Sequence, residues 1–269
     1  MDGIRTILDG ALECAGKAGE LIRRDWAGRS STRHKGPIDL VTDTDLAVEE
    51  LLIECLSRLL PGAAIVSEES APAAQSGLRW IIDPVDGTTN FVHRIPQVAT
   101  SIALWNDGRP LLGVVNAPML DECFYAVRGQ GAFLNGAPIH VSHACTLADT
   151  LLATGFPYDL PEHMPLIMAR LATTLPRVQG LRRMGAAAID LAYVASGRLD
   201  AYYEDWLKPW DMAAGWLLVE EAGGAVTDLA GAPLDFGRPL LASNGLVHAQ
   251  LAALLGSAGQ EHIEQRAAD

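Results

Sequence analysis

Apolar side chains at helical spacing open the chain, and short apolar runs follow them. Over residues 2–26 the apolar positions recur three or four residues apart, which predicts an amphipathic helix, and a second helix is expected over residues 46–60. Short runs bounded by turn residues then predict strands at residues 64–66, 80–82, 100–105, 112–116, 122–128 and 132–134. Asn135-Gly136 is a hairpin signal. Residues 1–144 are therefore expected to form a helix pair against a large antiparallel sheet.

After residue 145 the pattern changes to an alternation of strands and helices. Strands are predicted at residues 151–154, 199–203, 225–227 and 240–243, and helices at residues 161–175, 186–196, 209–222 and 246–255. Such alternation is typical of an α/β unit with a more parallel sheet. No linker rich in Gly, Ser or Pro separates residues 1–144 from residues 145–269, so the two halves are expected to pack as one continuous unit. The fold class is accordingly a mixture of α+β and α/β.

The composition is that of a globular protein. Hydrophobic residues make up 49% of the 269 positions and charged residues 20%, which is not the balance of a disordered chain. No apolar run approaches the roughly 18 to 20 residues of a membrane helix, and the first ten residues do not resemble a secretory signal. We therefore expect a cytoplasmic protein with no membrane partner. The net charge of −13 argues against nucleic acid as a partner, because no basic stripe is available to contact phosphates.

The four cysteines, Cys14, Cys55, Cys123 and Cys145, are scattered and form no C-x-x-C pair. Cys14 and Cys55 lie within helical patterns, where the expected role of a cysteine is that of a small buried apolar side chain. Neither a zinc site nor a disulfide framework is predicted.

Two carboxylates, Asp83 and Asp86, stand at the end of the apolar run that begins at Trp80. Other acidic residues also stand at the ends of predicted elements: Asp43, Asp45, Glu68, Glu69 and Asp211. The simplest interpretation is local, because Asp-Pro and Asp-Gly are ordinary turn dipeptides and a carboxylate favours a helix N-terminus. The number of such positions nevertheless points to a shared site.

Carboxylates that converge among apolar residues repel one another and become protonated unless a cation holds them. Oxygen ligands with no histidine or thiolate among them suit Mg²⁺ or Mn²⁺. The glycine of Gly87-Thr88-Thr89 allows a close backbone approach, and N–H groups at the start of a following helix would bind phosphate. This combination predicts a site for phosphoryl transfer or phosphate hydrolysis.

Competing motifs are absent or incomplete. The sequence has no G-x-x-x-x-G-K-[ST], its Asp83–Gly87 stretch lacks the spacing of an EF-hand loop, and Gly129-Gln-Gly131 lacks the third glycine of a dinucleotide fingerprint. A glycosidase would also use paired carboxylates, but it has no need for the Gly-Thr-Thr anion site.

The motifs together resemble the inositol monophosphatase family. They are DLVTDTD at 39–45, SEES at 67–70, DPVDGTTNF at 83–91, GQGAFLNG at 129–136, RRMGAAAIDLAYVASGRLDAYYE at 182–204 and PWDMAAGWLLVEEAGG at 209–224. The resemblance implies a layered αβαβα fold and a lithium-sensitive phosphomonoesterase that uses two or three Mg²⁺ ions, with Mn²⁺ as a substitute. It also implies a homodimer.

The resemblance assigns roles to particular positions of this sequence. The implied metal ligands are the side chains of Glu68, Asp83, Asp86 and Asp211 and the main-chain carbonyl of Val85. Thr88, paired with Asp45, would orient a metal-bound water as the nucleophile, and Glu68 belongs to the same catalytic group. Glu69 is left as a neighbour of the ligands and Lys35 is left without a role.

Substrate contacts are implied at a second set of positions. The N–H groups of Gly87 and Thr88 would hold the phosphate beside Val85, Asp86 and Asp211. The alcohol half of the ester would meet Glu204 and the segment of Gly185, Ala186 and Ala187, with Arg182 as a further contact.

Asn90, where related branches begin a basic motif, favours the inositol-phosphate branch. The leading expectation is therefore Mg²⁺-dependent hydrolysis of a small phosphate monoester, with inositol monophosphate first among them. The alternatives are a related phosphatase acting on fructose bisphosphate, histidinol phosphate or a nucleotide phosphate, and a binding or regulatory protein that has kept the fold.

Overall fold

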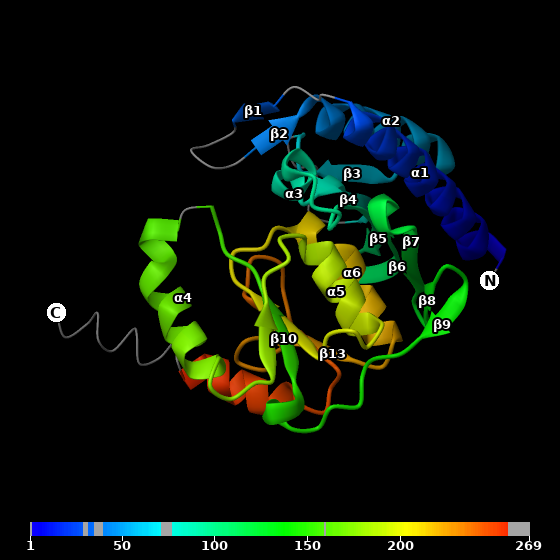
Figure 1. Ribbon diagram of the computed structural model, residues 1–269. Helices are drawn as coiled ribbons and strands as arrows, with labels where there is room; N and C mark the ends of the chain where they lie inside the picture. Colours follow the sequence, from blue (N-terminus) through cyan, green and yellow to red (C-terminus); the bar gives the residue numbers. More distant parts are fainter. Residues whose placement is uncertain (1, 29–31, 35–39, 71–76, 159, 258–269) are drawn as a thin grey trace.

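Two long helices at the start of the chain cover one face of the larger sheet (Figure 1). The computed structural model describes residues 2–28, 32–34, 40–70, 77–158 and 160–257. Helix α1 (Asp2–Ala27) and helix α2 (Asp43–Leu59) pack against each other and turn their apolar faces to the sheet, which confirms the predicted helix pair. None of the helices in the described ranges is both long enough and apolar enough to cross a bilayer.

The larger sheet has seven strands in the order β3-β4-β5-β6-β7-β8-β9. Its strands are β3 (Ala64–Ser67), β4 (Leu78–Asp86), β5 (Ala99–Asn106), β6 (Arg109–Ala117), β7 (Glu122–Val127), β8 (Ala132–Leu134) and β9 (Ala137–Ile139). Only β3 and β4 run parallel, so the prediction of a largely antiparallel sheet is confirmed. The turn between β8 and β9 has positive φ at Asn135 and Gly136, as a two-residue hairpin turn requires.

The smaller sheet has five strands in the order β11-β10-β12-β14-β13. They are β10 (Leu151–Thr154), β11 (Gly180–Arg182), β12 (Ala201–Glu204), β13 (Ala225–Asp228) and β14 (Leu240–Ser243). Strand β10 is parallel to both neighbours, whereas β14 is antiparallel to β12 and β13. The sheet is therefore mixed, and it is more parallel than the larger sheet, as predicted. Strand β13 is antiparallel to β14 because no helical crossover, of the kind that parallel strands usually need, joins the two.

Two helices fill the space between the sheets. Helix α5 (Ala187–Ala195) and helix α6 (Pro209–Glu221) are buried over most of their surface, as expected for helices that are apolar all round. Helix α4 (Leu160–Thr174) and a helix at residues 248–257 lie on the face of the smaller sheet opposite α5 and α6 (Figure 1). The order of layers is αβαβα, which confirms the expected fold class. One apolar cluster joins the larger sheet to α5 and α6, so residues from both sides of the predicted boundary near residue 144 share one core. The division of the chain at this residue remains a prediction.

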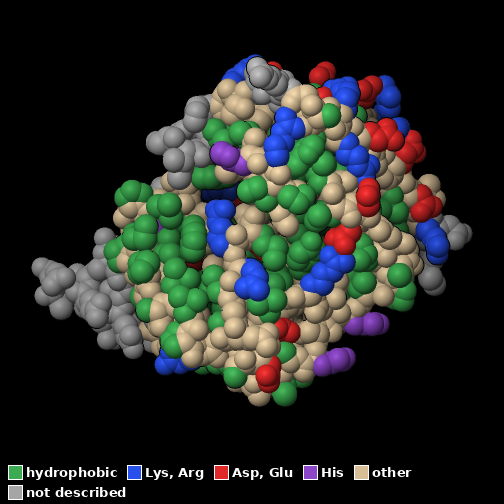
Figure 2. Space-filling view, in the orientation of Figure 1, with side chains coloured by type: hydrophobic (Ala, Val, Ile, Leu, Met, Phe, Trp, Pro, Cys, Tyr) green, Lys and Arg blue, Asp and Glu red, His purple; other side chains and the backbone are tan. Residues whose placement is uncertain are grey.

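Short elements complete the described chain: β1 (Thr32–His34), β2 (Leu40–Thr42), α3 (Thr88–His93) and the single 3₁₀ turns η1 (Pro118–Leu120) and η2 (Leu147–Asp149). Hydrophobic side chains gather on the surface over α4 in the view of Figure 2. Met164 and Met168 of this helix are exposed.

The cysteine prediction was wrong for one pair. Cys14 of α1 and Cys55 of α2 form a disulfide with their Cα atoms 6.0 Å apart, whereas Cys123 and Cys145 are free. The two partners are 41 residues apart in sequence, and only the packing of α1 on α2 brings them together. Cys14 is buried as predicted and Cys55 is partly buried, but burial by itself does not reveal a partner.

Candidate active site

Strand β4 delivers two carboxylates to the end of the larger sheet. The strand is buried from Arg79 to Asp86, and the side chains of Asp83 and Asp86 are only 2% and 9% exposed. A bulge between these two residues interrupts the pairing with β5. The main-chain N–H of Val85 donates to the Asp83 carboxylate at 3.1 Å. The bulge therefore places two acidic side chains in a small space at the end of the strand, and re-aiming of side chains is a common effect of bulges.

The turn after β4 requires a glycine. Gly87 has φ of 89°, and a Cβ atom at this position would lie 2.7 Å from the carbonyl oxygen of Gln97. Helix α3 begins at the next residue, Thr88. The side-chain amide of Asn90 in α3 donates to the carbonyls of Gln97 and Met184, each at 2.8 Å. Asn90 thus ties this turn to the segment that precedes α5.

The Thr88 hydroxyl is held against a buried carboxylate. Its Oγ1 lies 2.9 Å from Oδ1 of Asp45 and 3.1 Å from the Val85 carbonyl oxygen. Asp45 also accepts the main-chain N–H of Thr42 at 2.9 Å and the Thr42 hydroxyl, in a capping box at the start of α2. A hydroxyl has one proton, so donation to Asp45 leaves the Thr88 lone pairs available to accept a hydrogen bond.

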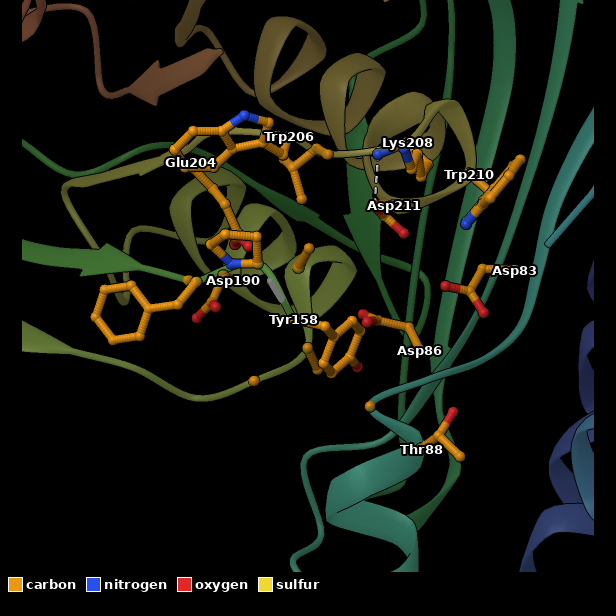
Figure 3. A pocket seen from close by; sticks show the side chains of 18 of the residues that line it. Asp83, Asp86, Thr88, Tyr158, Asp190, Glu204, Trp206, Lys208, Trp210 and Asp211 are labelled. Atoms are coloured by element: carbon orange, nitrogen blue, oxygen red, sulfur yellow. Dashed lines mark hydrogen bonds between the residues drawn. The ribbon is translucent and has the colours of Figure 1, made fainter. Parts of the chain in front are cut away.

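Further carboxylates reach the same cavity from other elements, and Figure 3 shows Glu204 and Asp211 among them. Glu68 follows β3, Asp211 lies in the first turn of α6, and Glu204 ends β12. The Lys208 N–H donates to Oδ2 of Asp211 at 2.6 Å, which fixes that carboxylate at the helix start. The cavity has a volume of about 970 Å³, and both halves of the chain line it.

The carboxylates raise one another's pKa. Burial raises the pKa of Asp83 well above its usual value, and the charges of Glu68, Asp86 and Asp211 add to the effect. Burial raises the pKa of Asp86 to about 7, although the Ala188 N–H at 2.8 Å opposes the shift. Burial likewise raises the pKa of Asp211 well above its usual value. The cluster cannot be fully ionised near neutral pH without a compensating cation.

This donor set fits a hard divalent cation. It offers only oxygen atoms, which suits Mg²⁺ or Mn²⁺ rather than zinc. The residues that could hold such ions are Glu68, Asp83, Asp86, Asp211 and the carbonyl of Val85. Among the residues that the structure describes, no three acidic, histidine or cysteine side chains already stand in an arrangement that would hold an ion. The side chains would have to draw together around the cation.

Glu204 occupies the other end of the cavity, away from Asp83 and Asp211 (Figure 3). The Tyr202 hydroxyl donates to its carboxylate. Gly155 makes room for that carboxylate, since a Cβ atom there would overlap Oε2 of Glu204 at 1.8 Å. Burial raises the pKa of Glu204 to about 7. Gly185, Ala186 and Ala187 line the cavity nearby.

Some of the positions assigned from sequence lie outside the cavity lining. Arg182 is exposed on β11, and its neighbour Arg183 lines the cavity instead. Asp45 acts on the site through its hydrogen bond with Thr88, and Glu69 is half-buried outside the lining. Lys35 lies outside the described residues.

Sequence reasoning missed several lining residues. Asp190 in α5 is 1% exposed, and its Oδ1 atom has no hydrogen-bond partner among the described residues. Burial and the charges of Glu204 and Asp86 raise its pKa well above the usual value. An aspartate within an otherwise apolar helix was the available signal. The aromatic residues Phe156, Tyr158, Trp206 and Trp210 also line the cavity, and nothing in their spacing marks them.

Similarity to known proteins extends over nearly the whole chain. The model of the inositol monophosphatase family matches residues 4–264. The Nus factor SuhB of Pasteurella multocida is 42% identical over 247 residues, which cover 90% of this chain and 91% of that protein. Inositol monophosphatase 2 of Solanum lycopersicum is 42% identical over 236 residues, which cover 85% and 89%.

A solved structure extends the likeness to the fold. Inositol monophosphatase from Anabaena superposes with a TM-score of 0.86 at 39% identity, covering 94% of this chain and 96% of that one. These matches support a phosphatase activity and a small-molecule phosphate substrate. The chain belongs to the inositol monophosphatase family.

Proposed function

We propose that this protein hydrolyses small phosphate monoesters with Mg²⁺ as cofactor and that inositol monophosphate is the leading substrate. The observation that carries the proposal is the buried carboxylate cluster at the end of β4, which shares one cavity with the Gly87-Thr88 turn and with Glu204. When bound, Mg²⁺ would neutralise these carboxylates, polarise the phosphate and lower the pKa of a water molecule. Glu68, Asp83, Asp86, Asp211 and the Val85 carbonyl would hold it.

The chain's own residues position the nucleophile and the phosphate. Thr88 donates to Asp45, so its lone pairs can accept a hydrogen bond from a water molecule and orient that water toward phosphorus. Asp45 fixes this orientation because Thr42 restrains it. The N–H groups of Gly87 and Thr88 stand at the start of α3, where main-chain donors lack partners within the helix and attract anions.

Glu204 is proposed to recognise the alcohol half of the ester. Its carboxylate can accept hydrogen bonds from substrate hydroxyls at the end of the cavity away from Asp83. The variant Glu204→Gln should lose about 10- to 150-fold in kcat/KM with inositol monophosphate, because a hydrogen bond to a charged group contributes roughly 1.5 to 3 kcal/mol. It should lose little with an aryl phosphate that has no hydroxyls. Equal losses on both substrates would mean that Glu204 supports the carboxylate cluster instead.

The experiment that tests the activity is phosphate release from a panel of monoesters with and without Mg²⁺. The panel should contain inositol monophosphate, glycerol phosphate, a sugar phosphate, fructose bisphosphate, histidinol phosphate and a nucleotide. Preference for one of the last three would favour a related phosphatase.

A second candidate is a binding role. It is favoured by relatives such as the P. multocida protein, whose name, Nus factor SuhB, describes no hydrolase. No release from any ester of the panel at saturating Mg²⁺ would favour this candidate. A homodimer also remains a proposal, and sedimentation or light scattering would test it.

A further inference from the structure

The side-chain amide of Asn90 is fully used by main-chain carbonyls. Asn90 lies in the first turn of α3 and is only 5% exposed. Its Nδ2 atom donates to the carbonyl oxygens of Gln97 and Met184, each at 2.8 Å, and lies 3.4 Å from the carbonyl oxygen of Gly185. An amide nitrogen carries two protons, so the two shorter hydrogen bonds use both of them.

The accepting carbonyls belong to two different parts of the cavity wall. The Gln97 carbonyl lies directly against the phosphate turn, residues 87–88, since a Cβ atom at Gly87 would be 2.7 Å from its oxygen. The Met184 carbonyl belongs to the alcohol segment, residues 184–187, whose last three residues line the cavity. Asn90 is itself outside the cavity lining, and it joins these two parts from behind.

The alcohol segment has few other hydrogen bonds. Within the described ranges, the main-chain groups of Met184 and Gly185 form no hydrogen bond with another main-chain group. The N–H groups of Ala187 and Ala188 bond to the Asp86 carboxylate, the latter at 2.8 Å. Asp86 is a proposed metal ligand, so this second link would have to adjust when a cation binds. The link through Asn90 involves no proposed ligand.

The phosphate turn is held by hydrogen bonds of its own. The Thr88 hydroxyl lies 2.9 Å from Asp45, and the Phe91 N–H donates to the Gly87 carbonyl at 2.9 Å. Neither bond involves the Asn90 side chain. Loss of the Asn90 amide should therefore release the alcohol segment and leave the phosphate turn in place.

We propose that Asn90 is a positioning residue that fixes the alcohol segment relative to the phosphate turn. The inference rests on the proposed phosphatase function and deepens it by naming what holds the two halves of the site together. Asn90 does not touch the substrate, so it acts through the main chain of residues 184–187. A released segment would no longer meet the alcohol while the phosphate is held at residues 87–88.

The variant Asn90→Ala tests the proposal by removing both donors. With inositol monophosphate, kcat/KM should fall by about 5- to 150-fold, as expected when two neutral hydrogen bonds to the alcohol are lost. The loss should lie mainly in KM, because the interactions removed belong to substrate binding rather than to the transition state alone. Inorganic phosphate has no alcohol half, so its inhibition constant should stay within about twofold of the original value.

Asn116→Ala is a matched control. The Asn116 amide also donates to a main-chain carbonyl at 2.8 Å, that of Ala15, but it joins β6 to α1 outside the cavity lining. This variant should lower the unfolding temperature without changing KM. An unchanged KM in Asn90→Ala would overturn the proposal. Equal weakening of inositol monophosphate and inorganic phosphate would also overturn it, because Asn90 would then support the whole site.

Two further measurements keep the test decisive. Should Asn90→Ala fail to fold, Asn90→Ser takes its place, since one hydroxyl cannot donate to both carbonyls, and the same results decide. If the original protein hydrolysed no ester, the phosphatase function itself would fail, and calorimetric binding of inositol monophosphate and inorganic phosphate would replace kinetics. Selectively weaker binding of the ester to Asn90→Ala would still support the positioning role, and unchanged binding would refute it.

Discussion

Removal of the buried charge at Asp86 should stabilise the folded protein when no cation is bound. Burial raises the pKa of Asp86 from 3.8 to about 7 in the folded protein without metal. At about 1.36 kcal/mol for each pH unit, this corresponds to roughly 4 kcal/mol of destabilisation once the group is ionised in both states. Asparagine keeps the size of the side chain and an oxygen that can accept the Ala188 N–H. In chelator at pH 8, Asp86→Asn should therefore be more stable than the original protein, by up to about 4 kcal/mol.

The pH dependence has a definite sign. A raised pKa means that the folded protein binds this proton more tightly than the unfolded chain does, so stability falls as pH rises from 3.8 through 7. The advantage of Asp86→Asn should accordingly shrink to about 1.6 kcal/mol at pH 5 and about 0.4 kcal/mol at pH 3.8, the unshifted value, and vanish below it. Urea unfolding in chelator at pH 4, 5, 6, 7 and 8 would measure it.

Added Mg²⁺ should cancel this advantage. A ligand that binds only the folded state stabilises it by about 4.1 kcal/mol at a thousand times its Kd, which matches the difference of roughly 4 kcal/mol at pH 8, and the variant has lost one proposed ligand. Turnover should fall by on the order of a thousandfold or more, because metal stabilisation of the transition state is worth several kcal/mol.

Two results would refute this reasoning. A variant less stable than the original protein in chelator at pH 8 would show that the Asp86 charge does not destabilise the folded protein. Native-like turnover at saturating Mg²⁺ would remove Asp86 from the proposed ligands.

Further predictions concern other parts of the molecule. Loss of the Cys14–Cys55 disulfide, which closes a 41-residue separation, should lower the free energy of unfolding by about 4 kcal/mol if chain entropy dominates; equal urea midpoints for the original protein and Cys55→Ala under oxidising conditions would contradict this. Gly155→Ala should displace the Glu204 carboxylate, costing about 1 to 3 kcal/mol of stability and weakening polyol substrates more than aryl phosphates; a crystal structure with Glu204 unmoved would argue against it. Lithium should inhibit phosphate release at fixed Mg²⁺, an expectation that rests on the family resemblance alone; a flat lithium response would weaken the branch assignment and leave the carboxylate cluster standing.

Local features were predictable because short stretches of sequence determine them. Helix α1, the Asn135-Gly136 hairpin and strand β10 follow from spacing and turn chemistry within a few residues. The closeness of Asp83 to Asp86 was predictable for the same reason, since both lie in one nine-residue strand. The family resemblance then supplied roles that spacing could not, such as the partnership of Thr88 with Asp45 across 43 positions.

Only the tertiary structure decided which distant residues meet. It joined Cys14 to Cys55 and seated Glu204 against Gly155. It also turned Arg183 rather than Arg182 toward the cavity, because adjacent side chains at the end of a strand point in different directions. The antiparallel direction of β14 relative to β12 and β13 depended on these neighbouring strands rather than on the residues of β14. Apolar spacing shows which face of an element is buried, but the partner of that face is set by how whole layers pack, and a linear pattern carries little of that information.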